Sequence, residues 1–128
     1  MGVLLTGKPV SNMIKEETRL PIWRALSDLF LDTEITDFTY QYIARTIRKS
    51  GLTVAEVEAI LWHEVFPVLK SNLSSVAGVW DGWSDEWLLQ HFEVREKPGL
   101  VQSLPPVIRE IKACWAKVLT TLDNMDAD

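Results

Sequence analysis

The sequence predicts an all-α fold, a compact single-domain bundle of about five helices. Five segments carry apolar side chains at the three- and four-residue spacing that buries one face of a helix. Each segment has a plausible cap or stop signal, and few stretches show the alternation typical of strands. The chain has 128 residues, of which 47% are hydrophobic and 24% charged, which suits one globular domain. The brief connections between the five segments favour a bundle.

The first expected helix spans residues 20–31 and has Pro21 in its first turn, where a proline is tolerated. The second spans residues 37–49, because Thr36 can cap its start and Gly51 is a natural stop. We expect the core contacts of this second helix to be Phe38, Ile43 and Ile47, helped by Tyr40 or Tyr42.

The third expected helix has the clearest start, because Thr53 and Glu56 match a capping box. Its apolar stripe contains Pro67, which removes a backbone donor and crowds the preceding turn. We therefore expect a kink or an early end at this proline. The fourth and fifth helices are expected over residues 84–92 and about 103–123.

The helical domain is expected over residues 18–123, between a flexible leader at 1–17 and an acidic tail at 124–128. Cys114 is the one cysteine of the chain, so no intramolecular disulfide or multi-cysteine metal site can form. No window approaches the roughly 18 uninterrupted apolar residues of a membrane span. A reducing cytoplasmic location fits these observations best.

The charge of the chain limits its partners. There are 13 basic and 18 acidic residues, which gives a formal net charge of −5. This charge argues against non-specific binding to nucleic acid or to an anionic membrane surface. It is compatible with a basic protein partner, and it is also an ordinary charge for a small soluble domain.

No complete catalytic or cofactor motif is present. His63 and Glu64 begin the zinc-protease helix motif, but its second histidine would fall at position 67, which is proline. There is also no nucleophile elbow, phosphate loop or dinucleotide-binding glycine turn. His63 and His91 could share a metal with Glu64 or a nearby acid, although such a histidine is more often a packing residue. We expect no cofactor and no metal, and we expect Cys114 to be buried and inert.

Four acidic residues lie within ten positions, in a stretch from residue 25 to 44 that has no lysine or arginine. They are Asp28, Asp32, Glu34 and Asp37. In a helix, Asp28 and Asp32 would share one face and repel each other near its negative end. The simplest interpretation is a solvated face that also caps the second helix. The alternatives are an acidic patch for a basic protein, or a cation or acid–base catalytic site.

A second acidic cluster alternates with tryptophans over residues 80–87. It contains Trp80, Asp81, Trp83, Asp85, Glu86 and Trp87. The simplest interpretation is that all six tryptophans of the chain are core or half-core residues. The functional one is that exposed tryptophan beside acids forms a protein-binding hot spot. We expect Trp87 to pack inward, Trp80 to brace the connector before it, and Trp83 to reach solvent or a partner.

Three segments, residues 23–34, 58–69 and 72–80, resemble a family of small uncharacterised bacterial proteins. The resemblance covers about residues 20–92 and implies a bacterial source and one small domain, but no functional residues. The chain is also similar in type to bacterial immunity proteins, which are small, often acidic and helical, and neutralise a toxin by binding it. This second similarity is one of class and rests on no motif.

The leading hypothesis is a non-enzymatic bacterial protein-binding module, most plausibly an immunity or antitoxin-like inhibitor of a basic toxin. The two acidic clusters would face the toxin, with Trp80 or Trp83 as the anchor. One alternative is a small metal-dependent or acid–base enzyme that uses Asp28, Asp32 and Glu34 with His63 or Glu64. Another is a structural or oligomeric subunit, so that the chain is a monomer or a homodimer.

Overall fold

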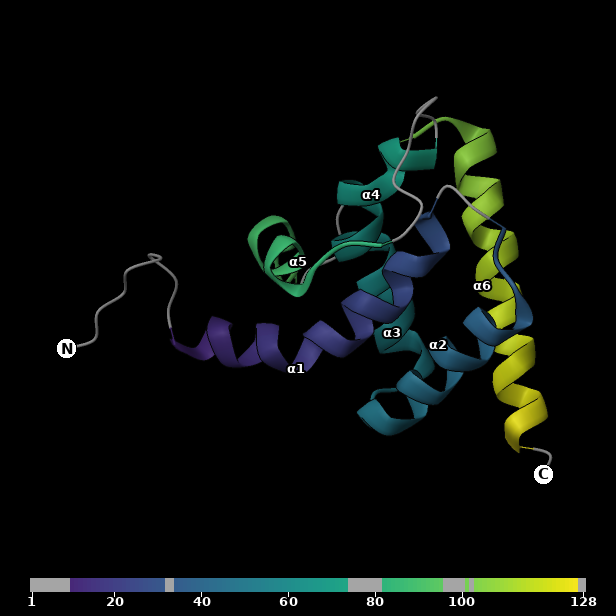
Figure 1. The fold of residues 1–128 in the computed structure, drawn as a ribbon, viewed down its shortest axis with the longest axis horizontal. Helices are drawn as coiled ribbons and strands as arrows, with labels where there is room; N and C mark the ends of the chain where they lie inside the picture. Colours follow the sequence, from purple (N-terminus) through teal and green to yellow (C-terminus); the bar gives the residue numbers. More distant parts are fainter. Residues whose placement is uncertain (1–9, 32–33, 74–81, 96–100, 102, 127–128) are drawn as a thin grey trace.

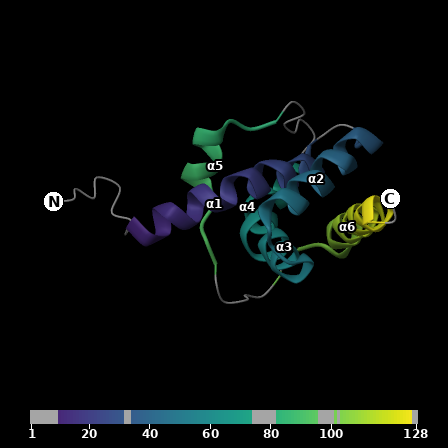
Figure 2. The same ribbon diagram turned by 90° about the horizontal axis from the view of Figure 1, so that it is seen from below.

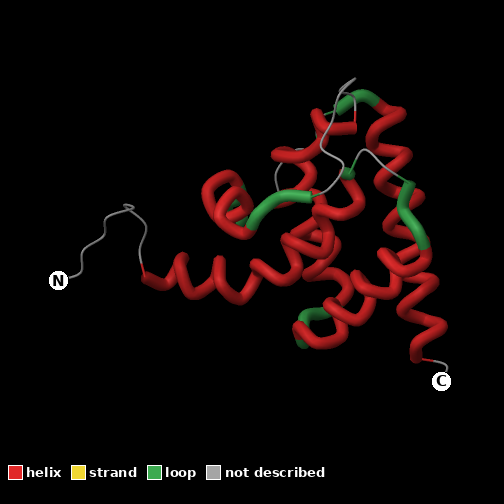
Figure 3. The backbone as a smooth tube through the Cα atoms, in the orientation of Figure 1, coloured by secondary structure: helices red, strands yellow, loops and turns green. Residues whose placement is uncertain are grey.

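The computed structural model describes residues 10–31, 34–73, 82–95, 101 and 103–126, and it is helical with no strand in these parts (Figures 1 and 3). The elements run in the following order: α1 (Val10–Ser27), a short 3-10 turn η1 (Asp28–Phe30), α2 (Asp37–Ser50), α3 (Val54–Ile60), a π-helical turn η2 (Leu61–Val65), α4 (Phe66–Leu73), α5 (Asp85–His91) and α6 (Pro105–Asp126). Because α3, η2 and α4 follow without a break, the described chain forms five helical segments, as predicted.

The helices cross rather than run parallel. In Figure 1 α1 lies horizontally and α6 vertically, and in Figure 2 α6 is viewed nearly along its own axis. α2 packs against both of them. Figure 2 also shows α5 and the continuous α3–α4 helix on opposite sides of α1, and both contact it. The α1 helix is therefore covered by α2, α5 and η2. No helix of the described residues is long and apolar enough to span a membrane.

The first helix differs from the prediction at both ends. It begins at Val10, ten residues before the expected start, and ends at Ser27. The chain then tightens into η1 and leaves helical geometry at Leu31, whose backbone is extended (φ −70°, ψ 146°). The expected helical face shared by Asp28 and Asp32 therefore does not form, because Leu31 breaks the helix between them. Asp32 itself lies outside the described residues.

Pro67 changes the third helix without ending it. Directly before the proline, η2 widens the helix, and the Phe66 N–H donates to the Leu61 carbonyl five residues back. A proline has no N–H and crowds the preceding turn. A π-turn is one way to accommodate this lost hydrogen bond and steric clash. The Thr53–Glu56 capping box at the start of this helix is confirmed, with both reciprocal hydrogen bonds present.

The core is built around aromatic side chains from several helices. Trp23, Phe30, Phe66 and Phe92 are fully buried. Trp23 meets Phe92 edge-on at 5.4 Å between ring centroids, and Phe30 meets Phe66 in the same way at 6.1 Å. Edge-to-face contacts of this kind add to the hydrophobic gain from burial. This aromatic core links α1 with η1, α4 and the end of α5.

The prediction that Phe38 faces the core is wrong, because 82% of its surface is exposed. The buried face of α2 consists of Tyr40, Ile43, Ala44 and Ile47. At roughly 100° per residue, Phe38 lies about 200° around the helix from Tyr40 and thus points away from this face. Cys114 was expected to be buried, and its side chain is half-buried against the core.

Candidate functional site

The predicted acidic residue Asp85 has an intramolecular partner. Arg24 donates from Nε and Nη2 to the two Asp85 carboxylate oxygens, both at 2.9 Å, which joins α1 to α5. The hydrogen bond from Arg24 lowers the pKa of Asp85. Because two-point pairing with arginine holds a carboxylate firmly, Asp85 is less available to an outside partner than predicted. Glu86, next to it in the first turn of α5, is exposed.

Asp28 lies in a different environment. It opens η1 at the carboxyl end of α1, and burial raises the pKa of its half-buried carboxyl group. Within the described ranges no lysine or arginine forms an ion pair with it. The phenol of Tyr42 has a raised pKa, first because it is desolvated and second because Asp28 is near. Burial thus makes the charge of Asp28 locally unfavourable, and no basic side chain of the described residues pairs with it.

The amino end of α2 presents acids and an exposed phenyl ring together. Glu34 and Asp37 are both exposed, and Asp37 is in the first turn of the helix. Phe38 follows directly and is 82% exposed. We call Glu34, Asp37 and Phe38 the α2 amino-end surface, and Asp28 lies near Tyr42 of the same helix. Its acids were predicted from the sequence, whereas Phe38 was expected in the core, because the sequence left open whether Tyr40 or Tyr42 faces inward.

The described tryptophans pack as core or half-core residues. Trp23 and Trp115 are buried, whereas Trp62, Trp83 and Trp87 are half-buried against the core. The Trp83 and Trp87 rings are tilted at 6.0 Å, and Trp87 stacks on His91 at 3.9 Å. Trp83, which was expected to reach solvent or a partner, is half-buried, so part of it packs against the core and part is exposed. The predicted residues Trp80 and Asp81 lie outside the described part of the chain.

Glu64 is a buried carboxylate that is engaged in hydrogen bonds within the protein. It accepts hydrogen bonds from Trp23 Nε1 at 2.8 Å, Arg19 Nε at 3.1 Å and the Arg95 backbone N–H at 3.0 Å. It borders a hollow of about 190 Å³, whose other lining residues include His63 and His91 but neither Asp28 nor Glu34. A cleft that joins these groups would favour the enzyme alternative, and this hollow does not join them. Among the described side chains, no three that could ligate a metal gather anywhere.

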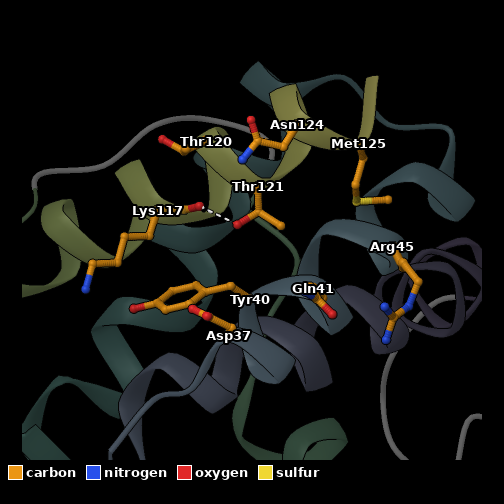
Figure 4. A pocket seen from close by; sticks show the side chains of 9 residues that line it. All are labelled: Asp37, Tyr40, Gln41, Arg45, Lys117, Thr120, Thr121, Asn124 and Met125. Carbon is orange, nitrogen blue, oxygen red and sulfur yellow. Dashed lines mark hydrogen bonds between the residues drawn. The ribbon is translucent and has the colours of Figure 1, made fainter. Parts of the chain in front are cut away.

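A larger hollow of about 550 Å³ lies between α2 and α6 (Figure 4). We call it the α2–α6 groove. Nine side chains line it: Asp37, Tyr40, Gln41, Arg45, Lys117, Thr120, Thr121, Asn124 and Met125. Its floor includes the buried Tyr40 ring, over which the Lys117 ammonium lies at 5.8 Å. Desolvation, and secondarily a hydrogen bond with Cys114, raises the pKa of Tyr40, so this phenol stays neutral.

Comparison with known proteins identifies a family. Residues 17–123 match a domain of unknown function, DUF7079. The chain belongs to the DUF7079 family. This match agrees with the resemblance to an uncharacterised family over residues 20–92, and it extends the similarity through most of α6. No curated protein and no solved structure matches the chain.

The DUF7079 domain contains the whole α2 amino-end surface. It also contains most of the α2–α6 groove, whose last two lining residues, Asn124 and Met125, follow the matched range. The first feature combines an apolar anchor with negative charge, which suits protein recognition. The second is polar and open, which suits a small hydrophilic ligand.

Proposed function

We propose that this DUF7079 protein is a non-enzymatic protein-binding module that recognises a basic partner through the α2 amino-end surface. The observation that carries the proposal is the 82% exposure of Phe38 between acids. Aromatic side chains, phenylalanine among them, are enriched at the cores of protein interfaces relative to the rest of the surface.

Phe38 is a suitable anchor for energetic reasons. Burying a phenylalanine side chain contributes roughly 1.5–3 kcal/mol through the hydrophobic effect, and its short side chain loses little rotamer entropy. In the fold it contributes almost nothing, since it lies outside the core. The ring therefore gains most when a partner covers it. Phe38 replaces Trp83 as the proposed anchor, because Trp83 already packs against the core.

The charge of the surface indicates the kind of partner. Glu34 and Asp37 are exposed, and Asp28 is a half-buried carboxylate without a basic partner among the described residues. On a chain with a net charge of −5, such a surface attracts a basic protein and speeds its association. The partner chemistry is thus a cationic surface with an apolar pocket for a phenyl ring.

For the biological setting we retain the immunity hypothesis. In a bacterial cytoplasm, a protein of this kind would neutralise a basic toxin by covering its active-site cleft. The support is the similarity in type to immunity proteins and the acidic surface, and no motif adds to it.

The test is an affinity capture with a matched pair of variants. The purified wild-type chain, Phe38→Ser and Leu104→Ser are each used to capture proteins from the source organism. Leu104 is also an exposed apolar residue, at 65%, but lies at the start of α6. We expect one basic protein to bind wild type and Leu104→Ser, and to bind Phe38→Ser at least tenfold more weakly.

The same capture can overturn the proposal. Equal retention of every captured protein by wild type and Phe38→Ser would show that Phe38 is not an anchor. With a captured basic partner purified, its own activity is then assayed with and without the chain. Full activity of the saturated complex would remove the inhibitor hypothesis but leave the binding function standing.

A further inference from the structure

The α2–α6 groove has a positive lining on a negative protein. Arg45 and Lys117 line it with a single acid, Asp37, whereas the whole chain carries a net charge of −5. Figure 4 shows Arg45 at one end, beside Met125 and Gln41, and Lys117 at the other, beside Tyr40. The volume of about 550 Å³ is within the range of small-molecule sites.

The polar groups of the groove are only partly used by the fold. Thr121 donates its hydroxyl proton to the Lys117 carbonyl at 2.8 Å, and Thr120 donates to the Ala116 carbonyl at 3.1 Å. Both threonine oxygens retain lone pairs that can accept a hydrogen bond. By contrast, no described side chain forms an ion pair with Arg45, and none forms a hydrogen bond with the Gln41 or Asn124 amide.

These donors suit a particular chemistry. A guanidinium is planar and matches a carboxylate or phosphate with two parallel hydrogen bonds. Gln41 precedes Arg45 by four residues, so the two lie one turn apart on the same face of α2. Across the groove Asn124 offers another amide from α6 (Figure 4). The set is a cation with two neutral amides, which can hold an anionic group together with adjoining hydroxyls.

We propose that the α2–α6 groove binds a small organic anion, a hydroxylated carboxylic acid or a phosphate ester, with its anionic group on Arg45. The remaining polar part of the ligand extends along the threonines toward Lys117. Asp37, at the Lys117 end, opposes the negative charge of the ligand. This proposal concerns a small-molecule site, and its test uses no protein partner, although Asp37 lies both in the groove and on the α2 amino-end surface.

The experiment is a ligand titration of the purified chain followed by the backbone amide signals in NMR. Citrate and glycerol 3-phosphate are the two probes, and they distinguish a carboxylate from a phosphate ligand. We expect saturable shifts confined to α2 and α6 for at least one probe. Arg45→Gln should weaken binding at least tenfold, whereas Arg109→Gln, an exposed arginine on α6 outside the groove, should leave it unchanged.

Asp37→Asn supplies a second variant that does not depend on the folding of Arg45→Gln. It removes the opposing charge, so binding of the same probe should tighten severalfold. The proposal is overturned if neither probe gives saturable shifts up to about 10 mM, the concentration of a very weak site. Equal weakening by Arg45→Gln and Arg109→Gln would also overturn it, since that result indicates only a general charge effect.

Discussion

At the scale of single residues, Asp28 and Phe38 each occupy a position that does not favour the stability of the fold. Asp28 is a half-buried carboxylate at the carboxyl end of α1, where the helix dipole disfavours a negative charge. Phe38 exposes a phenyl ring that the core would bury with gain. Residues that weaken a fold locally are often retained for function. Phe38 belongs to the α2 amino-end surface, and Asp28 lies near Tyr42 of the same helix.

The first prediction concerns Asp28. Asp28→Asn should raise the free energy of unfolding at pH 7 by a few tenths of a kcal/mol, because it removes an unfavourable charge from a helix end. Burial raises the pKa of Asp28, so the penalty is present while the carboxyl is ionised. The difference between variant and wild type should therefore shrink as the pH falls through the raised pKa toward the ordinary value. Chemical denaturation at several pH values measures it.

The same variant separates stability from binding. If Asp28 contributes to partner recognition, Asp28→Asn should bind the basic partner more weakly, even though it has a higher free energy of unfolding than wild type. A variant that is less stable than wild type at pH 7 would show that the carboxylate has a stabilising contact in solution. That outcome would argue against a role of Asp28 in partner recognition.

At the scale of elements, Glu64 connects three parts of the chain. It belongs to η2 and accepts hydrogen bonds from Trp23 and Arg19 of α1 and from the Arg95 backbone beyond α5. Its carboxylate is nearly inaccessible to solvent, with 1% of the side chain exposed. The π-turn that precedes Pro67 contains this residue, so the turn and the buried carboxylate are parts of one junction.

The second prediction follows from this junction. Glu64→Ala should lower the free energy of unfolding by about 3 kcal/mol, because it leaves the Arg19 charge and two N–H donors without their acceptor. Glu58→Ala is the matched control, since Glu58 also accepts an indole N–H, from Trp115 at 3.2 Å, but is exposed. That control should cost less than about 1 kcal/mol. Equal losses in the two variants would contradict a structural role specific to Glu64.

At the scale of the whole molecule, the net charge of −5 and its distribution decide how partners approach. The α2 amino-end surface is acidic, whereas the nearby α2–α6 groove is lined by two cations and one acid. The two surfaces meet at Asp37, which belongs to both, and they differ in electrostatic character. A basic protein would be attracted to the acidic surface, and a small anion to the Arg45 and Lys117 ends of the groove.

The third prediction tests the effect of this charge distribution on association. Glu34→Lys should slow association with the basic partner roughly threefold to tenfold at low salt, and the difference should fade as salt is added. Glu110→Lys makes the same change of charge on an exposed part of α6 and is the control. Stopped-flow association at several salt concentrations measures both. An equal effect of the two variants would mean that only the total charge matters.

Light scattering of the same samples tests whether the chain is a monomer or a homodimer.

Much of the fold could be predicted from short-range patterns in the sequence. Apolar spacing predicted five helical segments. The Thr53–Glu56 capping box starts the helix at the expected position, and the helix is distorted into a π-turn directly before Pro67. These features depend on residues within one or two turns of each other. The start of α1 at Val10 was missed, because no cap or strong apolar stripe distinguishes the residues before Leu20.

The candidate sites depended on contacts between distant residues, which local spacing does not contain. Sequence placed Asp85 among the partner-binding acids, but Arg24, 61 residues away, pairs with it. Sequence placed Phe38 in the core, but the rotation of α2 against α1 and α6 left it outside. The α2–α6 groove was not predicted at all, because its two walls come from helices that only tertiary packing brings together. The sequence by itself thus determined the helices and the net charge, and tertiary structure decided which side chains remain available for binding.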